Sequence, residues 1–505
     1  MKFNIFKRKK NVVTNYEGAK AYKLTPELEL YSAVVTTGLS ETFYEKDGKR
    51  LERVQELMKK NDAEFVAKLA VYARNKMYMR SIPMVLAVEL AKENSGNTVV
   101  SKAVNGVVQR ADEITELLAY YQLANKRSGT KKLNKLSKQV QKGLSEAFNR
   151  FDEYQFSKYN RATEISLRDA LFLVHPKAKN EEQQKVFNKI AAKELAVAYT
   201  WETELSTLGQ KKFANEKEKA NAFRAKWEEL IDSGKLGYMA LLRNLRNIME
   251  AEVSWEKMKK VCAVIANENA VAKSKQLPFR FLAAYREVKA MRSDYVSMVL
   301  NALEDAVAAS VKNMSGFNEN TRVLIACDVS GSMQKPVSAK SKVLLYDIGL
   351  MLGMLLQSKC KRVVSGMFGN TWKIINMPNR NILANVDEYY KREGEVGYAT
   401  NGYLVIMDLF NRGVVMDKVM LFTDCQLWNS NGNGNNLAKA WKMYKTIAPG
   451  AKLYLFDLAG YGNAPVNIQR DDVTLIAGWS DKVFDVLYAV ENGGSAIEMI
   501  KQIQL

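Results

Sequence analysis

Residues 51–314, more than half of the chain, form one long series of amphipathic helical patterns. Apolar residues recur there at spacings of three and four, and short polar stretches interrupt them. An amphipathic helix cannot bury its apolar stripe alone, so consecutive helices without long linkers favour stacking of pair upon pair. No clean repeat period is present in this region, and the helical spacing alone therefore predicts an α-solenoid.

The pattern changes near a turn-like stretch at 316–318. Beyond it, short apolar runs typical of buried strands alternate with helical segments, which predicts a doubly wound, mainly parallel sheet. The predicted strands are 323–327, 363–368, 373–377, 419–423, 453–458 and 473–476, and the predicted helices are 341–357, 402–411, 437–446 and 482–490. The chain thus divides into a helical domain, 1–318, and an α/β domain, 319–505. Ligands of such sheets bind at the carboxyl ends of the strands.

The formal charge of +20 is distributed unevenly along the chain. The last 185 residues carry 20 basic and 16 acidic side chains, so that +16 of the excess lies in the first 320 residues. A solvated surface would explain the same total. The distribution nevertheless favours a helical domain that holds a polyanion such as nucleic acid.

Cysteine and histidine usage disfavours several classes of protein. Cys262, Cys327, Cys360 and Cys425 stand singly, which fits a reducing compartment. His175 is the only histidine, which limits Ser-His or Cys-His catalysis and His-rich zinc sites. The sequence has no secretory signal and no run of about 18 apolar residues. We therefore expect a cytoplasmic monomer without a membrane span.

Positive side chains lie on the polar faces of two predicted helices. One stripe of 131–148 carries four lysines, Lys131, Lys135, Lys138 and Lys142. In 236–249, Arg243 and Arg246 face away from the apolar stripe. Both helices could present these cations to RNA, although ion pairing with a neighbouring helix would also explain the two arginines.

Aromatic rings and cations interleave in the stretch between these two helices. The residues concerned are Tyr154, Phe156, Lys158, Tyr159 and Arg161. Lys and Arg bind backbone phosphates, and unpaired bases stack on aromatic rings. The stretch therefore predicts an RNA contact, with core packing as the alternative for each ring.

Three loops at the predicted ligand edge of the sheet carry oxygen-bearing side chains. Asp328, Ser330 and Ser332 follow the first strand directly, Thr400 lies just before a helix, and Asp424 ends an apolar strand. Mg²⁺ prefers oxygen ligands and keeps some of its waters. The five side chains predict a site for Mg²⁺ or another divalent cation, with a metal-free sheet bearing polar loops as the alternative.

These residues resemble the metal-ion-dependent adhesion site of von Willebrand factor A domains. In that family a DxSxS loop, a loop threonine and a later aspartate surround a divalent ion. The ion keeps one position open for an acid from a partner, so the resemblance implies partner capture rather than chemistry.

A basic helical array followed by such a domain resembles the Ro autoantigen family, whose members carry a TROVE domain. Four segments carry this resemblance: YEGAKAY at 16–22, SLRDAL at 166–171 with HPK at 175–177, YMALLRNLR at 238–246, and LPFRF at 277–281. The implied fold is a ring-like α-solenoid of HEAT-type helical repeats, followed by a doubly wound, Rossmann-like von Willebrand factor A domain.

The resemblance also implies two RNA surfaces. In the family the hole of the ring admits the single-stranded end of a misfolded RNA, and the basic outer surface holds a small structured Y RNA. Lys158 and His175 match family positions implicated in RNA contact, whereas Arg161 is offset by one residue from a basic position. Three further candidates lie in or near matching segments: Arg168, Lys177 and Arg280. A buried, hydrogen-bonded side chain is the alternative for His175.

We therefore expect a non-enzymatic RNA-binding protein of RNA quality control. Its expected partners are a small non-coding RNA, a misfolded or single-stranded RNA, and an exoribonuclease or acidic protein ligand at the metal site. One alternative is a protein-interaction adaptor that binds no RNA, against which the charge distribution counts. Another is a metal-dependent phosphoryl-transfer enzyme that uses Asp328 and Asp424. The sequence contains no GxxxxGK[ST] loop, no HExxH motif and no second carboxylate cluster that would favour the enzyme.

Overall fold

The computed structural model describes residues 12–37, 49–126, 136–160, 163–311, 320–337, 341–427 and 436–505. Two compact units interleave along the chain: the α/β unit joins Met1–Leu57 to Asn313–Ile497, and the helical unit joins Met58–Lys312 to Glu498–Leu505. This division differs from the predicted domains, 1–318 and 319–505. The first strands and helices belong with the C-terminal sheet, and the last residues belong with the helices. The turn at 316–318 lies outside the described residues.

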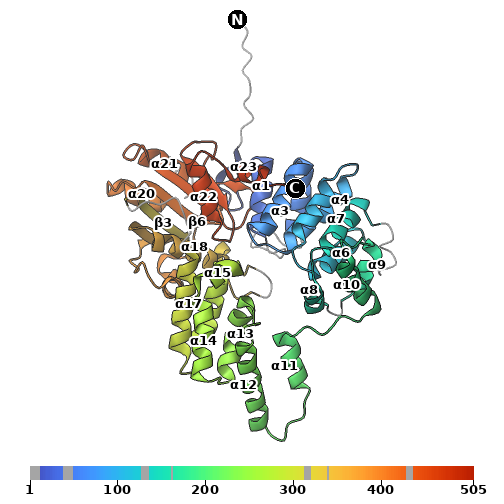
Figure 1. The fold of residues 1–505 in the computed structure, drawn as a ribbon. Helices are drawn as coiled ribbons and strands as arrows, with labels where there is room; N and C mark the ends of the chain where they lie inside the picture. Colours follow the sequence, from blue (N-terminus) through green and yellow to red (C-terminus); the bar gives the residue numbers. More distant parts are fainter. Residues whose placement is uncertain are drawn as a thin grey trace. The chain divides into compact units, whose positions relative to one another are not determined.

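The helical unit is built from helices α3 to α17, as the sequence pattern predicts (Figure 1). Their bounds are α3 Ala63–Asn75, α4 Ser81–Glu93, α5 Val99–Val107, α6 Asp112–Ala124, α7 Lys138–Phe148, α8 Glu153–Tyr159, α9 Leu167–Val174, α10 Glu181–Ala192, α11 Trp201–Gly209, α12 Glu216–Asp232, α13 Tyr238–Glu250, α14 Trp255–Ala266, α15 Glu268–Ser274, α16 Pro278–Lys289 and α17 Val296–Val311. Helices near in sequence pack together, α3 with α4 and α5, α5 with α7, and α17 with α14 and α16. Among the described helices, none has the length and apolar content needed to cross a membrane.

Side-chain caps set where several of these helices begin. Asp152 and Gln155 each bond the backbone N–H of the other at the start of α8. Thr200 and Thr203 do the same at the start of α11. Such reciprocal caps satisfy two amides that the first helical turn leaves without a partner. They fix the start, and hence the rotation, of two helices that border the pocket described below.

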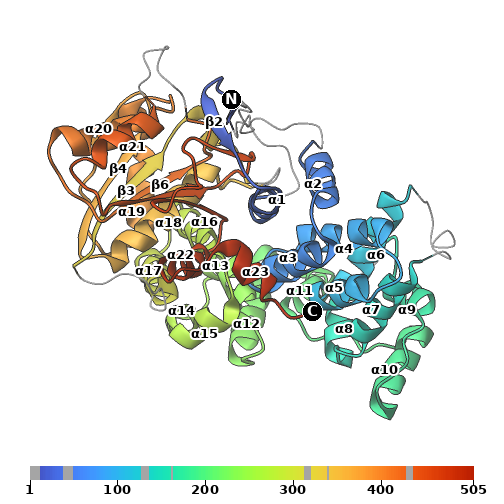
Figure 2. The same ribbon diagram turned by 90° about the horizontal axis from the view of Figure 1, so that it is seen from above.

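The α/β unit contains a six-stranded sheet in the order β5-β4-β3-β6-β7-β9. The strands are β3 Arg322–Asp328, β4 Arg362–Phe368, β5 Trp372–Ile374, β6 Lys418–Thr423, β7 Lys452–Asp457 and β9 Val473–Ala477, and the helices are α18 Leu345–Lys359, α19 Ile382–Lys391, α20 Tyr403–Asn411, α21 Leu437–Tyr444 and α22 Val483–Glu491. All pairs are parallel except β4 with β5. Figure 2 shows α18 and α19 on one side of the sheet and α20 and α21 on the other. The sheet is therefore doubly wound, as predicted.

The N-terminal segment adds a small sheet that the sequence analysis did not predict. Strands β1 (Val12–Thr14) and β2 (Lys20–Lys23) form a hairpin, and β2 pairs with β8 (Asn463–Ala464). Helix α1 (Pro26–Val35) packs near β9, where the Tyr31 hydroxyl donates to the Ala477 carbonyl at 2.9 Å. Ser32 donates to the buried carboxylate of Asp457. These strands are too short for their sequence pattern to reveal, and contacts distant in sequence hold them.

We expect Gly143→Ala to destabilise the helical unit by about 1–3 kcal/mol, because overpacking a tight contact forces side chains and backbone apart. A Cβ at Gly143 in α7 would collide with the Ser101 carbonyl oxygen and the Val104 side chain of α5. Gly450→Ala is the matched control, since no atom lies within 4 Å of the added Cβ. Chemical denaturation of the full chain measures both changes. Equal midpoints for the two variants would show that α5 and α7 do not pack this closely.

Candidate nucleic-acid interface and metal centre

A pocket of about 920 Å³ opens among the helices of the helical unit. Its walls come from α8, the residues that lead into α11, the connection between α12 and α13, the first turns of α13, and α15. Ligand pockets typically measure roughly 300–1,000 Å³. The pocket is therefore large enough for a small ligand or for one end of a longer one.

Tyrosine rings form much of the lining of the pocket. They are Tyr154, Tyr159, Tyr199 and Tyr238. The Tyr238 hydroxyl donates to a backbone carbonyl at 2.8 Å, and the Tyr199 hydroxyl donates to a glutamate carboxylate at 3.0 Å. These two residues therefore offer a ligand ring surface rather than a free hydroxyl. Tyr154 is 46% exposed, whereas Phe156 from the same predicted stretch is fully buried. Core packing, the alternative stated above, holds for Phe156.

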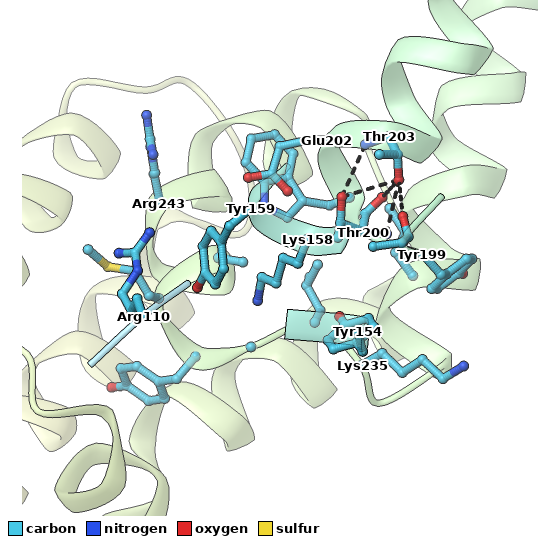
Figure 3. Close-up of a pocket in the computed structure, with 18 of the residues that line it drawn as sticks. Arg110, Tyr154, Lys158, Tyr159, Tyr199, Thr200, Glu202, Thr203, Lys235 and Arg243 are labelled. Carbon is cyan, nitrogen blue, oxygen red and sulfur yellow. Dashed lines mark hydrogen bonds between the residues drawn. The ribbon is translucent and has the colours of Figure 1, made fainter. Parts of the chain in front are cut away.

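Cations accompany these rings along the pocket. Lys158 Nζ lies 5.6 Å from the centroid of the Tyr159 ring, and Lys235 Nζ lies 5.2 Å from that of Tyr199. Arg243 lines the same pocket, at the end opposite Lys235 in the view of Figure 3. The arrangement can meet both the phosphates and the bases of one unpaired strand.

Arg110, at the entrance to α6, holds the Tyr159 ring in place. Its guanidinium lies 4.4 Å from the ring centroid (Figure 3). The carboxylate of Asp112 accepts two hydrogen bonds from the same guanidinium, at 3.1 and 2.8 Å. Arg110 is thus neutralised while it positions the ring. This role of Arg110 could not be predicted from the sequence, because no local pattern links the start of α6 to α8.

A second group of predicted contacts lies on α7 and beyond the end of α9, and none of these described residues lines the pocket. Lys138 and Lys142 are exposed one turn apart on α7, and His175 and Lys177 are exposed after α9. The side chain of Gln141 donates to the carbonyl of the last residue of α9 at 3.1 Å, which ties the two segments together. We call these four exposed residues the α7–α9 surface. The exposure of His175 excludes the buried alternative.

The remaining predicted contacts of this region are divided between described and undescribed parts of the chain. Arg168 is exposed, lies over the Phe172 ring at 5.1 Å, and donates to a backbone carbonyl of α10 at 2.7 Å. Lys131, Lys135 and Arg161 lie outside the described residues.

The three predicted arginines of α13 and α16 differ in their surroundings. Arg246 pairs with Glu250 and Glu287, with nitrogen–oxygen distances of 3.6 Å to each. The ion-pair alternative therefore holds for Arg246. Arg243 and Arg280 are exposed, and within the described residues neither forms an ion pair.

Asp328 and Asp424 lie at the ends of neighbouring parallel strands in the α/β unit. The register of β3 and β6 sets Cys327 beside Phe422. One residue further on, the Thr423 hydroxyl donates to Asp328 Oδ2 at 2.6 Å, and Asp424 follows at once. Both aspartates are at most 1% exposed. The parallel pairing therefore places two buried carboxylates at one edge of the sheet.

Two loops with hydroxyl-bearing side chains lie at the same edge of the sheet. The Ser330 and Ser332 oxygens lie 3.2 Å apart. The backbone N–H of Gly331 donates to the Tyr398 carbonyl at 3.2 Å, which holds the loop of Thr400 beside the serine loop. Thr400 is 5% exposed. The structure thus places Asp328, Ser330, Ser332 and Asp424 at one edge of the sheet and holds the loop that carries Thr400 beside them.

Burial raises the pKa of both carboxyl groups. It raises the pKa of Asp328 to about 6, and the negative charge of Glu17 adds to this rise. The pKa of Asp424 rises to about 7, first because of burial and then because of the charge of Asp328. Two carboxylates at this edge are therefore costly to ionise without a cation.

One buried oxygen tests whether the site suits a metal ion. Asp424 Oδ1 accepts a hydrogen bond from the Gln426 amide at 2.9 Å, whereas Oδ2 is buried and has no hydrogen-bond partner in the described part of the chain. Such an oxygen is costly unless something binds it. Two carboxylates and three hydroxyls are ligands that a hard divalent cation prefers, so these residues fit Mg²⁺ or a similar ion.

The described residues hold no larger group of acidic, histidine or cysteine metal ligands. Among them, no three Asp, Glu, His or Cys side chains are grouped so as to hold a metal ion. The predicted centre depends on serine and threonine hydroxyls for its remaining oxygens.

The hairpin turn between β1 and β2 also borders the predicted metal centre. The Asn15 side chain donates to the Leu427 carbonyl at 2.9 Å, and the Tyr16 amide donates to the Gln426 side chain at 2.9 Å. The first of these bonds joins residues 412 positions apart. No sequence pattern could indicate it.

Comparison with known families and curated proteins gives two kinds of match. A family model described as the TROVE domain matches residues 8–226 and 195–296. Telomerase protein component 1 of Mus musculus is 40% identical over 89 residues, 18% of this chain and 3% of that protein. The Rattus norvegicus protein is 41% identical over 86 residues, 17% of this chain and 3% of that protein. The chain thus matches only a small fraction of the length of these relatives.

Among solved structures, the Ro (RSR) protein of Deinococcus radiodurans has a similar fold. It superposes with a TM-score of 0.58 at 17% sequence identity, over 93% of this chain and 100% of that chain. The likeness confirms the predicted fold class, a helical-repeat array combined with a doubly wound α/β domain.

We expect the metal-free protein to lose stability as the pH rises. When folding raises the pKa of a carboxyl group, the folded state holds the proton more tightly than the unfolded state. The resulting stabilisation is complete below the pKa of the unfolded chain, about 4, and is lost as the pH rises through the pKa of the folded protein. Asp328 and Asp424 place that loss between about pH 4 and about pH 7. In EDTA, the melting temperature of the wild type should therefore fall as the pH rises across this window. The fall should be smaller in Asp424→Asn. Mg²⁺ should restore stability at the high-pH end in the wild type alone.

Asp471→Asn serves as the control, because Asp471 is an exposed carboxylate of the same unit. A pH dependence in Asp424→Asn equal to that of the wild type would exclude the buried pair as its source.

Proposed function

This chain belongs to the TROVE-domain family of RNA-binding proteins, and from that premise we propose that it is a Ro-type protein whose helical unit holds two kinds of RNA. The pocket takes the single-stranded end of a misfolded RNA, the part that the family resemblance assigns to the central hole. The α7–α9 surface takes a small structured RNA of the Y type. Members of the family are RNA-binding proteins rather than enzymes. The proposed role is therefore recognition in RNA quality control, without chemistry on the RNA.

One observation carries this proposal, the alternation of tyrosine rings with cations along a pocket of about 920 Å³. Stacking on a ring tolerates any base, and a cation binds any phosphate. A site of this composition favours unpaired RNA of many sequences over one particular sequence. This lack of sequence preference suits a protein that selects misfolded RNA by its free end.

The α7–α9 surface has a different character. Lys138, Lys142, His175 and Lys177 are exposed cations or potential cations, and the pocket rings do not belong to this surface. Structured RNA is bound mainly through its backbone and shape, for which a basic face without stacking rings is sufficient.

For the α/β unit we propose that the five-residue centre binds Mg²⁺ or another divalent cation and captures an acidic group of a partner. The bound cation would supply a positive charge, and the chain's own part would be to hold two carboxylates and three hydroxyls in place and to exclude bulk water. A protein ligand such as an exoribonuclease would dock there. The proposed setting is a monomer in the cytoplasm.

Replacing Tyr154 by Ala is expected to weaken binding of short single-stranded RNA by about 5- to 150-fold, the range given by loss of one base–ring stacking contact. Tyr488→Ala is a matched control, because Tyr488 is 47% exposed but lies on α22 of the other unit. Fluorescence anisotropy with labelled oligouridylate over a salt series measures both. A flat, near-zero dependence of wild-type affinity on salt would favour the adaptor that binds no RNA.

The double variant Lys138→Glu/Lys142→Glu is expected to weaken binding of a structured RNA while leaving oligouridylate binding unchanged, because α7 does not line the pocket. Lys439→Glu/Lys442→Glu makes the same change of charge on exposed positions of α21 and is the control. Gel-shift titrations with a hairpin RNA compare them. An equal loss of hairpin binding in both double variants would indicate a general charge effect and no specific surface.

A further inference from the structure

Two arginines of the helical unit carry positive charges that the fold does not balance. Helices α13 and α16 pack together and bring Arg243 and Arg280 into electrostatic range of one another. Although Arg280 is exposed, surrounding protein atoms remove part of the water around its guanidinium and lower its pKa, and the charge of Arg243 lowers it further. Both effects lower the pKa, which means that the surroundings disfavour the positive charge of Arg280.

Other arginines near the pocket have acidic partners. Arg246 lies one turn from Arg243 on the same helix and pairs with Glu250 and Glu287. Arg110 pairs with Asp112 at 2.8 Å. Within the described residues, Arg243 and Arg280 have no such partner, in contrast to Arg246 on the same helix as Arg243. The structure therefore leaves a specific pair unbalanced.

The position of Arg280 does not favour the stability of its helix. It is the third residue of α16, whose first turn holds no acidic residue and whose N-terminus has no side-chain cap. The positive end of the helix dipole destabilises a cation there, typically by a few tenths of a kcal/mol to about 1 kcal/mol. Helix stability alone thus does not explain an arginine at this position.

Neighbouring rings fix where Arg280 stands. Its guanidinium lies 5.4 Å from the ring centroid of Phe279. The next residue, Phe281, is fully buried and meets the pocket residue Tyr238 edge to face, with 6.4 Å between ring centroids. The start of α16 is therefore anchored to the helix that carries Arg243 into the pocket.

We propose that Arg243 and Arg280 form a phosphate subsite at the edge of the pocket, which holds one phosphate of the strand whose bases stack inside. This inference rests on the proposed function and adds the ligand group that the arginine pair binds. A phosphate placed between the two guanidiniums removes their repulsion and accepts charge-assisted hydrogen bonds from both. The pocket rings then receive the base attached to that phosphate, so that the two parts select a nucleotide in an unpaired strand.

The test compares the full-length wild type with Arg243→Gln/Arg280→Gln in binding of labelled oligouridylate over a salt series. The double variant should lose about tenfold or more in affinity, as expected for charged hydrogen bonds. In a plot of log affinity against log salt, the negative slope should also become shallower by about 0.7, the contribution of one phosphate on a single strand. Arg246→Gln is the matched control and should change neither quantity, because Glu250 and Glu287 already neutralise Arg246. A double variant with wild-type affinity and slope overturns the subsite.

Two arms identify which phosphate is bound. Oligouridylate is used with a 5′-phosphate and with a 5′-hydroxyl. An equal loss for both in the double variant identifies an internal phosphodiester, whereas a loss confined to the phosphorylated oligomer identifies the terminal group. Either result supports the subsite.

A measurement without RNA separates this inference from the proposed function. Without ligand, Arg280→Gln should melt at the same or a higher temperature than the wild type, because it removes a repelled charge. Inorganic phosphate should raise the melting temperature of the wild type more than that of the double variant. If oligouridylate fails to bind but phosphate stabilises the wild type selectively, the anion site stands and the RNA function fails. If phosphate stabilises the wild type and the double variant equally and oligouridylate does not bind, the phosphate subsite and the proposed RNA function are both wrong.

Discussion

The helical unit depends on mutual burial of apolar stripes by helices too short to be stable alone. Isolated helices shorter than roughly 12–15 residues are marginal in water, and α8, α9, α11 and α15 are all shorter than this. Their stability must come from packing against neighbours, which directs their polar faces and connecting segments outward. The pocket is a product of this constraint, because its walls are largely ends of short helices and the connections between them. Aromatic residues at helix ends thus become ring surfaces for a ligand without disturbing the core.

Charge balance separates the cations that acidic side chains neutralise from those without such a partner among the described residues. Acidic partners neutralise Arg110 and Arg246, and the first of these uses its fixed guanidinium to hold a tyrosine ring. Lys158, Arg243 and Arg280 have no acidic partner among the described residues, and they lie in or beside the pocket. A positive excess that the fold leaves unbalanced at a cavity is the electrostatic complement of a polyanion. The net charge of the chain alone could not show where that excess lies.

In the α/β unit, the parallel pairing of strands positions the charged side chains of the candidate metal centre. The register of β3 and β6 brings Thr423 to Asp328, to which its hydroxyl donates, and Asp424 follows directly at the same edge; both aspartates have almost no exposure. Burial disfavours both negative charges, which makes the edge receptive to a divalent cation. The N-terminal hairpin lies against the loop that follows β6, so the first residues of the chain help to build the surroundings of this centre.

Local spacing in the sequence predicts the helices, the strands and the candidate metal ligands, because each of these predictions starts from a short pattern along the chain. A period of 3.6 or 2 fixes which side of an element is apolar, and a DxSxS loop after a buried strand fixes its place at the sheet edge. Periodicity shows which side of its own helix a residue occupies, but it does not show what faces that side. Only tertiary structure therefore decided that Arg246 is neutralised while Arg243 is not, and that Phe156 is buried while Tyr154 lines the pocket. The N-terminal hairpin was likewise beyond the sequence, since its strands gain stability from residues more than four hundred positions away.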